Sequence, residues 1–360
     1  MKIAIIGTVG VPAQYGGFET LVENILDHTG GEVCYEVYCS GKIYKENRAK
    51  QYKNARLVYL PFKANGWQSI PYDVASIFRA LFSSDKLLIL GTSGCVVLPI
   101  IRLFSKKEII VNIDGLEHRR EKWGKLAKRF LKLSESMAVR FANVVIADNV
   151  AIQQYVKTEY GKDAVVVEYG GNHVLEKGND TFLDKLRLLK QDFAFTVCRI
   201  EPENNIHVIL EAFKQMPNEK LVAVGNWHKS VYGQQLRQQY GDCENIYMLD
   251  AIYDIQSLNG LRENCRYYVH GHSAGGTNPS LVEAMSLGLP VVAFDVVYNR
   301  ETTENKAFYF QDGKSLIKTV ASLSADPLNA NAAAMKEVAQ RRYRWDIIVK
   351  KYEDLFKSIR

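Results

Sequence analysis

The sequence predicts an α/β protein made of two doubly wound domains, each built on a parallel sheet. In the first half, short apolar runs alternate with segments of helical spacing, which indicates strands covered by helices on both faces of a sheet. The same alternation restarts after residue 190. The chain has 360 residues, 47% of them hydrophobic, which is enough for two domains that each bury a core.

One set of apolar runs predicts the strands of the first sheet, and a second set predicts those of the other. The first set is 2–8, 33–40, 55–62, 86–91, 108–113, 143–148 and 164–169. The second set is 193–200, 220–226, 245–250, 266–271 and 290–295. Helices are expected between most of these runs, for instance over 18–28, 74–82 and 125–141.

The boundary between the domains is predicted within 169–184, a stretch rich in glycine and polar residues. The first domain is therefore expected over residues 1–172 and the second over residues 173–342. Residues 343–360 carry apolar side chains at helical spacing, which predicts a separate C-terminal helix.

The composition excludes several classes of protein. No apolar stretch reaches the roughly eighteen residues that could span a membrane, and the N-terminus is predicted to be a strand rather than a signal peptide. A cytoplasmic location is therefore expected. The six cysteines form no CxxC pair and are expected to be reduced thiols. Without a His/Cys cluster or a carboxylate pair at a strand end, no metal or other cofactor is expected.

The net charge of +6 is concentrated in one stretch, 117–132, which holds seven Lys or Arg residues and two Glu. The rest of the chain is close to neutral, so no nucleic-acid partner is expected. Trp123, Leu126 and Phe130 are interleaved with these cations, which is the pattern of a helix that lies on an anionic bilayer. The alternative is an amphipathic helix that packs on the core and exposes a basic face.

Residues 270–295 combine the end of one buried strand, a glycine-rich turn, a helix that carries Glu283 and a second buried strand. Thr277 or Asn278 can cap the N-terminus of that helix. Free amides at a helix N-terminus after such a turn can bind a phosphate. The alternative is an ordinary βαβ crossover, in which the glycines only permit a tight turn.

This stretch resembles the signature of family-4 glycosyltransferases of the GT-B fold, in which two glutamates eight residues apart hold a nucleotide-sugar. The resemblance implies two Rossmann-like domains that face a cleft, with a C-terminal helix that crosses back to the N-terminal domain. Glu283 matches the second glutamate, which binds the ribose hydroxyls in the family. Gly276, Thr277 and Asn278 would offer backbone amides to the donor sugar and its diphosphate. Gly275 stands in the place of the first glutamate, which speaks against the usual hexose donors.

A glycine loop over 7–20 follows the first predicted strand and precedes a helix. Gly16 and Gly17 at the helix start would let a diphosphate approach the backbone closely, although a purely structural loop is the alternative. The wording GxPAxYGGFET resembles bacterial rhamnosyltransferases of this family that act in surface-polysaccharide assembly. Tyr15 and Glu19 are expected on the acceptor side of the site.

Two further stretches are expected to bind the donor. In RIEPENN, Arg199 would grip the diphosphate, Asn204 stands where the family usually has a lysine, and Glu203 lies between them. The rhamnosyltransferases carry a similar RIEPENN, while a surface arginine at a strand end is the alternative. After the strand 245–250, Ile252 and Tyr253 would frame the nucleobase, unless they are simply a buried Ile and a surface Tyr.

The predicted strand 108–113 delivers Asp114 to its carboxyl end, where doubly wound sheets bind their ligands. Many family-4 enzymes have a histidine close to the reacting sugar at this point, so Asp114 is the candidate catalytic residue. The alternative is a turn-forming aspartate. His118, Arg119 and Arg120 follow it and are expected to bind the acceptor, the two arginines through its diphosphate.

The resemblance as a whole implies a hexosyltransferase that moves L-rhamnose from dTDP-β-L-rhamnose with retention of configuration. The implied acceptor is a saccharide on a polyprenyl diphosphate, reached by peripheral attachment to the inner face of the cell membrane. Alternatives are the same fold with another donor such as a UDP-hexose, a non-hydrolysing sugar-nucleotide 2-epimerase, or a non-catalytic nucleotide-sugar-binding module.

Overall fold

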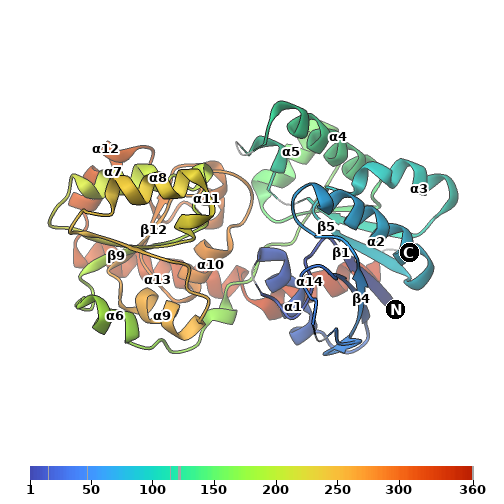
Figure 1. Ribbon diagram of the computed structural model, residues 1–360, viewed down its shortest axis with the longest axis horizontal. Coiled ribbons are helices and arrows are strands. Elements are labelled where there is room, and N and C mark those ends of the chain that lie inside the picture. The colour runs from blue at the N-terminus through green and yellow to red at the C-terminus, as the bar shows by residue number, and fades with distance from the viewer. Residues whose placement is uncertain (15, 47, 114, 121–122, 359–360) are drawn as a thin grey trace. The chain divides into compact units, whose positions relative to one another are not determined.

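The computed structural model of the protein describes residues 1–14, 16–46, 48–113, 115–120 and 123–358 (Figure 1). The chain divides into two compact units. Met1–Tyr169 and Trp345–Arg360 make up the N-terminal unit, and Gly170–Arg344 make up the C-terminal unit. The chain therefore leaves the first unit and returns to it with its last helix.

The N-terminal unit is built on a sheet with the strand order β3-β4-β2-β1-β5-β6-β7-β8. Its strands are β1 (Lys2–Ile6), β2 (Cys34–Ser40), β3 (Gln51–Tyr52), β4 (Ala55–Leu60), β5 (Lys86–Leu90), β6 (Glu108–Asn112), β7 (Val144–Ala147) and β8 (Val165–Val166). In the centre β1 pairs in parallel with β2 and β5, so Ile3 lies opposite Tyr35 on one side and Lys86 on the other. The predicted parallel strands are confirmed. Antiparallel β3 lies outside the predicted runs, because two residues carry no pattern of their own.

Helices and short 3-10 turns follow most of these strands. They are α1 (Gly17–His28), η1 (Gly66–Gln68), α2 (Ser69–Ser83), η2 (Cys95–Val97), α3 (Leu98–Phe104), η3 (Glu117–Arg119), α4 (Lys125–Phe141), α5 (Val150–Tyr160) and α14 (Trp345–Ser358). The helix predicted over 125–141 has the predicted bounds. Helix α2 begins five residues before the predicted 74–82, because Pro71 is tolerated in the first turn of a helix.

The last helix, α14, packs on the N-terminal unit, which confirms the predicted returning helix. At the end of β6, Asn112 Nδ2 donates to Tyr352 Oη at 3.0 Å. Near β5, Lys86 Nζ donates to the carbonyl of Phe356 at 2.8 Å. Trp345 is fully buried, and its ring lies 4.8 Å from that of Tyr169. The N-terminal unit is therefore completely packed only when α14 is in place.

The C-terminal unit contains a parallel sheet with the order β11-β10-β9-β12-β13-β14. Its strands are β9 (Phe193–Val197), β10 (Lys220–Val224), β11 (Ile246–Leu249), β12 (Tyr267–His270), β13 (Val291–Phe294) and β14 (Phe308–Phe310). Its helices are η4 (Asn172–Val174), α6 (Thr181–Leu186), η5 (Pro202–Asn204), α7 (Ile206–Lys214), η6 (Trp227–Lys229), α8 (Val231–Tyr240), α9 (Ile255–Asn264), α10 (Pro279–Ser286), α11 (Val297–Thr302), α12 (Gly313–Ala321) and α13 (Ala325–Arg342). Phe213 and Trp227 are fully buried in a core between the strands and these helices.

Each sheet reverses its strand order once, which confirms the doubly wound prediction. In the N-terminal unit the reversal lies between β1 and β5, and in the C-terminal unit it lies between β9 and β12. Doubly wound sheets bind ligands outside the carboxyl ends of the strands at such a point. The loops that follow these four strands are therefore where functional side chains are expected.

Candidate functional site

In the C-terminal unit, the loops after β9 and β12 contact each other, and both carry predicted donor-binding residues. Asn204 joins them, because its Nδ2 donates to the carbonyl of Arg199 at 2.7 Å and its Oδ1 lies 2.7 Å from His272 Nδ1. The amide of Ser273 donates to the carbonyl of Glu203 at 2.8 Å. The structure thus brings together two motifs that are almost seventy residues apart in the sequence.

The three predicted residues of RIEPENN occupy different environments. The side chain of Arg199 is exposed, as a diphosphate ligand requires. Asn204 is buried, and its amide group makes hydrogen bonds on both sides, so it ties the two loops together. Glu203 is 8% exposed, and its Oε2 has no hydrogen-bond partner within the part of the chain that the structure describes.

The turn before α10 has the shape of an anion-binding helix N-terminus. Asn278 is the N-cap, and its Oδ1 accepts from the amide of Ser280 at 3.1 Å, so the capping alternative resolves in favour of Asn278. Thr277 is buried, as is Gly276. Gly275 has φ +96, a conformation that side chains rarely adopt. A glutamate at this position would strain the turn.

Glu283 lies in a buried ion pair on α10. Its carboxylate accepts from Arg262 of α9, whose side chain is 4% exposed, and Glu283 Oε1 lies 3.4 Å from His173 Nε2. Arg262 Nη1 also donates to Asn259 at 3.3 Å. Burial alone would raise the pKa of Glu283, but the Arg262 charge and the His173 contact lower it overall. The carboxylate is therefore ionised and held in one orientation.

The predicted nucleobase segment follows β11, the edge strand of the same sheet. Ile252 is half-buried and Tyr253 is 65% exposed. Asp254 caps α9 by accepting from the amide of Ser257 at 2.8 Å. Since all strands are parallel, this segment lies at the same carboxyl edge as the loops after β9 and β12.

In the N-terminal unit, the glycine loop after β1 is organised by Glu19. Its Oε1 accepts from Thr8 Oγ1 at 3.0 Å and from the amide of Val9 at 2.6 Å, and the residue is 7% exposed. Gly16 has φ +140, and a Cβ there would lie 1.9 Å from Glu19 Oε2. Glu19 therefore holds the loop in shape, and Gly17 begins α1. Tyr15 lies outside the described residues.

The predicted acceptor residues after β6 are only partly exposed. The candidate catalytic residue Asp114 lies outside the described residues. Arg119 is exposed, and its guanidinium carbon lies 4.9 Å from the centre of the Tyr155 ring. Arg120 is 6% exposed and lies 2.8 Å from Glu117 Oε1. Its charge is paired with Glu117 inside the unit, so Arg120 is not free for the diphosphate contact that the sequence predicts.

His118 is anchored by a glutamate on α4 that carries no signal in the sequence. Its Nδ1 lies 2.9 Å from Glu135 Oε2, and Glu135 also accepts from the hydroxyls of Tyr155 and Tyr160, each at 2.6 Å. Burial would raise the pKa of Glu135, but hydrogen bonds from His118, Tyr155 and Tyr160 outweigh it and lower the pKa to about 2. His118 is thus held by a carboxylate that stays ionised at neutral pH.

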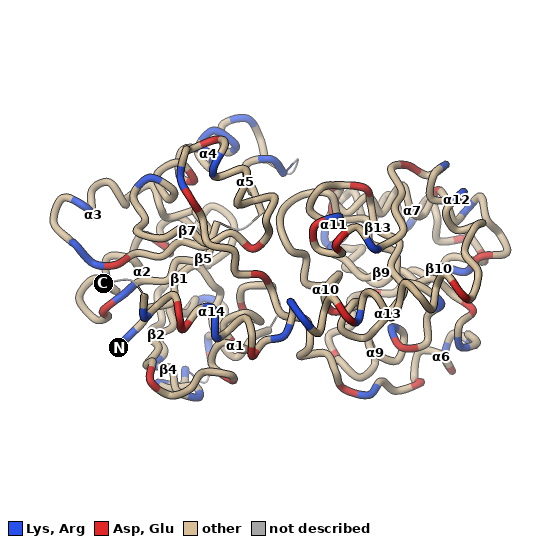
Figure 2. Tube along the Cα trace, turned by 180° about the vertical axis from the view of Figure 1, so that it is seen from behind, with Lys and Arg blue, Asp and Glu red and all other residues tan. Residues whose placement is uncertain are grey.

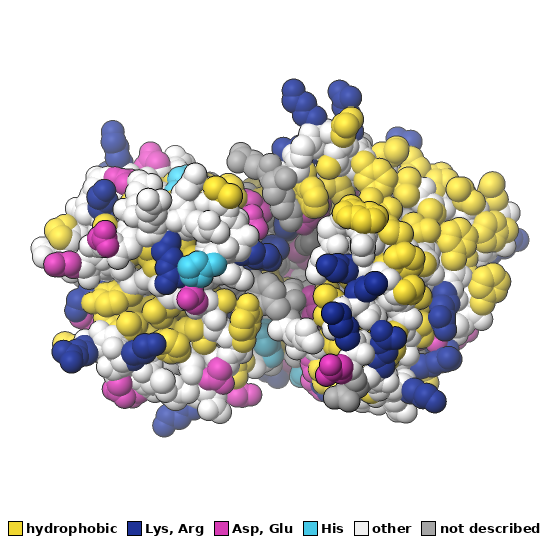
Figure 3. Space-filling view, viewed as in Figure 1, with side chains coloured by type: hydrophobic (Ala, Val, Ile, Leu, Met, Phe, Trp, Pro, Cys, Tyr) yellow, Lys and Arg dark blue, Asp and Glu magenta, His cyan; other side chains and the backbone are white. Residues whose placement is uncertain are grey.

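The basic stretch 117–132 is only partly a surface feature. Lys and Arg residues recur along α4 (Figure 2), and Leu126 is 80% exposed. Trp123 is half-buried and donates to Glu117 at 3.1 Å, and Phe130 is half-buried as well. More hydrophobic side chains gather over α2 and α3 than over α4 (Figure 3). None of the helices in the described residues is long and apolar enough to cross a membrane.

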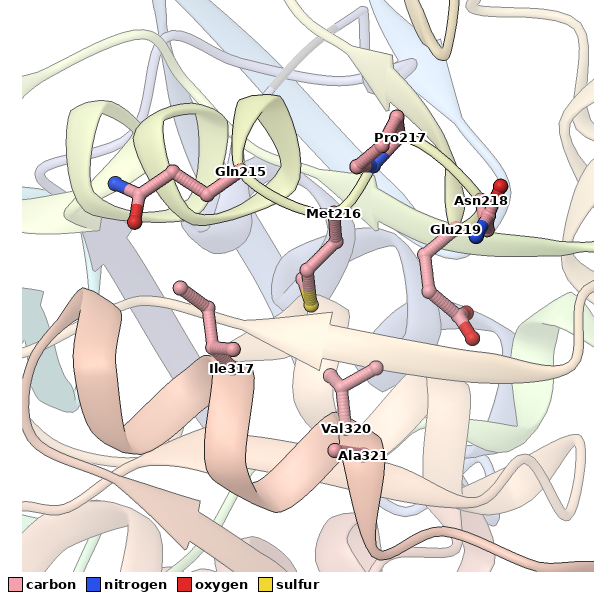
Figure 4. Close-up of a pocket in the computed structure, with 8 residues that line it drawn as sticks. All are labelled: Gln215, Met216, Pro217, Asn218, Glu219, Ile317, Val320 and Ala321. Atoms are coloured by element: carbon pink, nitrogen blue, oxygen red, sulfur yellow. The ribbon is translucent and has the colours of Figure 1, made fainter.

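A shallow pocket of about 310 Å³ lies elsewhere in the C-terminal unit. Met216 points toward α12, from which Ile317 and Val320 point back (Figure 4). The loop that lines it leads into Lys220, the first residue of β10. The pocket is therefore at the amino edge of the sheet, opposite to the predicted donor residues.

Two doubly wound parallel sheets, with a last helix that returns to the first, define the GT-B class of proteins. Residues 178–342 match the family model "Glycosyl transferases group 1", and residues 1–172 match "Domain of unknown function (DUF1972)". The chain thus has the GT-B fold, with a group 1 glycosyl transferase domain over residues 178–342 and a DUF1972 domain over residues 1–172.

Solved structures of the same fold cover the chain from end to end. Sucrose-phosphate synthase from Thermosynechococcus elongatus has a TM-score of 0.82 at 16% identity, over 99% of this chain and 98% of that one. HepE from Anabaena in complex with UDP has a TM-score of 0.77 at 18% identity, over 100% of both chains. The same protein with UDP and glucose gives 0.76 at 18% identity, again over 100% of both chains. No curated protein sequence matches the chain.

Proposed function

We propose that this glycosyltransferase moves L-rhamnose from dTDP-β-L-rhamnose to a lipid-linked saccharide, with retention of configuration. The observation that carries the choice of donor is Gly275, which replaces the first glutamate of the family signature in a conformation that favours glycine. Rhamnose is a 6-deoxy L-sugar, so its hydroxyls need a different set of partners from those of glucose or mannose. The resemblance of the loop 7–20 to rhamnosyltransferases supports the same donor.

In this proposal the donor lies along the carboxyl edge of the C-terminal sheet. Glu283 binds the ribose hydroxyls, and its ion pair with Arg262 keeps it charged and oriented. The amides at the N-terminus of α10 and the exposed Arg199 bind the diphosphate. Tyr253 and Ile252 frame the base. No metal is needed, since these groups supply the positive potential.

The proposed reaction is a front-face displacement. The acceptor hydroxyl attacks the anomeric carbon of rhamnose on the side from which the diphosphate leaves. The bond from that carbon to the diphosphate oxygen breaks, and the leaving diphosphate takes the acceptor proton. Asp114 is proposed to lie near the reacting sugar. His118, held by Glu135, and Arg119 are proposed to contact the acceptor, which is a saccharide on a polyprenyl diphosphate at the inner face of the cell membrane.

A second candidate donor is a UDP-hexose. The HepE structures that share this fold hold UDP, and one of them holds glucose, which favours this alternative. The two donors differ in what they require at Gly275. In the proposed scheme a hexose needs the hydrogen-bond acceptor that the family's first glutamate supplies, and a glycine offers no side chain for that contact.

Thermal unfolding with a panel of nucleotide-sugars tests the donor, because a ligand that binds only the folded state raises the melting temperature. We expect stabilisation and turnover with dTDP-rhamnose and little with UDP-glucose or GDP-mannose. Glu283→Ala and Arg199→Ala should each raise the donor Kd roughly tenfold or more, since a hydrogen bond to a charged group contributes about 1.5–3 kcal/mol. Lys336→Ala, which removes an exposed cation from α13, is the matched control. Equal turnover of UDP-glucose would overturn the rhamnose assignment.

A further inference from the structure

Helices α2 and α3 of the N-terminal unit expose an unusual amount of apolar surface. Phe82 is 88% exposed, Leu103 85%, Phe104 59% and Ile100 55%. The rings of Phe78 on α2 and Phe104 on α3 are stacked, with centroids 6.5 Å apart and planes at 16°, so the two helices share one surface. Hydrophobic side chains gather over this part of the unit in Figure 3. We call these five side chains the apolar face.

The exposed charges that belong to α2, α3 and the neighbouring α4 have one sign. Every residue of α2, α3 and α4 is described, and the acidic residues among them, Asp73 and Glu135, are both buried. The basic residues of the three helices are Arg79, Arg102, Lys125, Lys128, Arg129, Lys132 and Arg140. Of these, Arg79, Lys125, Arg129 and Arg140 are exposed. The three helices therefore combine protruding apolar side chains with cations and carry no exposed carboxylate. Asp85, three residues after Phe82 and outside the helices, is exposed and accepts a hydrogen bond from the amide of Lys2 at 2.8 Å.

A second copy of the chain does not fit this surface. A two-fold dimer would place the same patch on both sides of the interface, so cations would face cations. Such like-charge pairs cost several kcal/mol in an interface. The side chains of Phe82 and Leu103 also protrude almost fully, with exposed fractions of 88% and 85%.

We propose that the apolar face docks on an anionic lipid bilayer, with Phe82, Leu103 and Phe104 inserted among the lipids and the exposed cations of α2 and α4 at the headgroups. Apolar side chains flanked by Lys and Arg are the combination that binds anionic interfaces. This inference rests on the membrane attachment proposed above and makes it specific. It moves the insertion from the stretch 117–132, where Trp123 and Phe130 are half-buried, to α2 and α3.

Sedimentation with vesicles tests the docking surface, and a triple variant removes it. With vesicles of phosphatidylglycerol and phosphatidylcholine, we expect F82S/L103S/F104S to lower the partition coefficient by about tenfold or more, because each side chain loses its contact with the acyl chains. The matched control, L175S/L189S/V231S, removes exposed apolar side chains of the C-terminal unit and should change it by less than about twofold. Circular dichroism checks that both variants are folded.

Charge is tested separately. K125E/R129E/R140E should lower binding to the same vesicles by about tenfold or more, and added salt should weaken the binding of the wild-type chain. Equal binding of the wild-type chain to pure phosphatidylcholine would overturn the anionic part of the inference. Unchanged binding of F82S/L103S/F104S would overturn the docking surface itself.

Two further measurements separate docking on lipid from dimerisation and from a wrong choice of donor. Light scattering measures the oligomeric state. If the wild-type chain is a dimer and F82S/L103S/F104S is a monomer, a second copy covers the apolar face and the lipid assignment fails. Stabilisation by the nucleotide-sugar donor should be the same in both triple variants and the wild-type chain. A failed donor assignment would thus be visible in all of them, whereas failed docking would leave donor stabilisation intact.

Discussion

Two glutamates occupy comparable places in the two units but are held in different ways. Glu19 lies in the first turn of α1, the helix that follows the loop at the switch point of the N-terminal sheet. Glu283 lies on α10, which follows the loop after β12, on the other side of the switch point of the C-terminal sheet. Glu19 accepts hydrogen bonds from a hydroxyl and an amide of its own loop. Glu283 is balanced by two basic side chains from other segments, Arg262 and His173.

This difference shows what each carboxylate can do. Glu19 accepts from neutral donors of its own loop, so its contribution is local and consists of shaping that loop. Glu283 joins α9, α10 and the segment after residue 170, and its charge is compensated by side chains from these neighbours. A carboxylate held in this way can keep its remaining hydrogen-bonding capacity for a ligand, which suits the ribose contact proposed for it.

The largest expected effect comes from removing the charge partner of Glu283. Arg262→Met should destabilise the protein by about 3 kcal/mol, because it leaves a carboxylate that is only 15% exposed without its main counter-ion. Urea denaturation measures this loss. The double variant R262M/E283Q should recover most of it, since the uncompensated charge is then gone. A loss below about 1 kcal/mol for Arg262→Met would show that His173 alone suffices, and the contrast with Glu19 would disappear.

A third buried glutamate, Glu135, extends the comparison to pH. Its pKa is lowered from 4.5 to about 2, so the stability that it contributes is present above pH 4.5 and is lost as the pH falls toward 2. The shift corresponds to about 3 kcal/mol. Glu135→Gln should therefore flatten the decline of stability between these two pH values, as followed by thermal unfolding. An unchanged acid decline in this variant would mean that other groups cause it.

Glu19 should give the smallest effect and the clearest test of neutral anchoring. Glu19→Ala leaves the Thr8 hydroxyl and the Val9 amide without their acceptor and should cost about 2 kcal/mol. Glu19→Gln keeps an oxygen that can accept both hydrogen bonds and should cost less than about 1 kcal/mol. Denaturation midpoints of the two variants measure this difference. Equal losses would show that the negative charge matters at this site too.

Local patterns were sufficient to predict most of the fold. The run KIAIIG predicts a buried strand. The N-cap of α10 is predicted by Asn278 immediately before Pro279, since asparagine is a favourable cap and proline suits the first turn of a helix. The helix over 125–141 was predicted with its bounds because apolar side chains recur at helical spacing. Strand β14 (Phe308–Phe310) was missed, since three residues between polar neighbours give no periodic signal.

The partners of the site residues could not be predicted. Arg262 precedes Glu283 by twenty-one positions, and His173 precedes Glu283 by more than a hundred. Nothing in the charge pattern selects Arg262 among the 46 Lys and Arg residues or His173 among the seven histidines. The link from Asn204 to His272 and the burial of Arg120 likewise depend on how loops meet in space. The exposed face of α3 also escaped prediction, because LPIIRLF is as apolar as a core segment.

The return of α14 to the N-terminal unit has a consequence for the order of folding during synthesis. Domains usually fold as they leave the ribosome, the N-terminal one first. Here the N-terminal unit lacks the partners of Asn112 and Lys86 until residues 345–358 have emerged. The C-terminal unit is continuous in the chain and can be complete before them. A nascent chain of this protein thus carries a finished second unit while its first unit still has an open side.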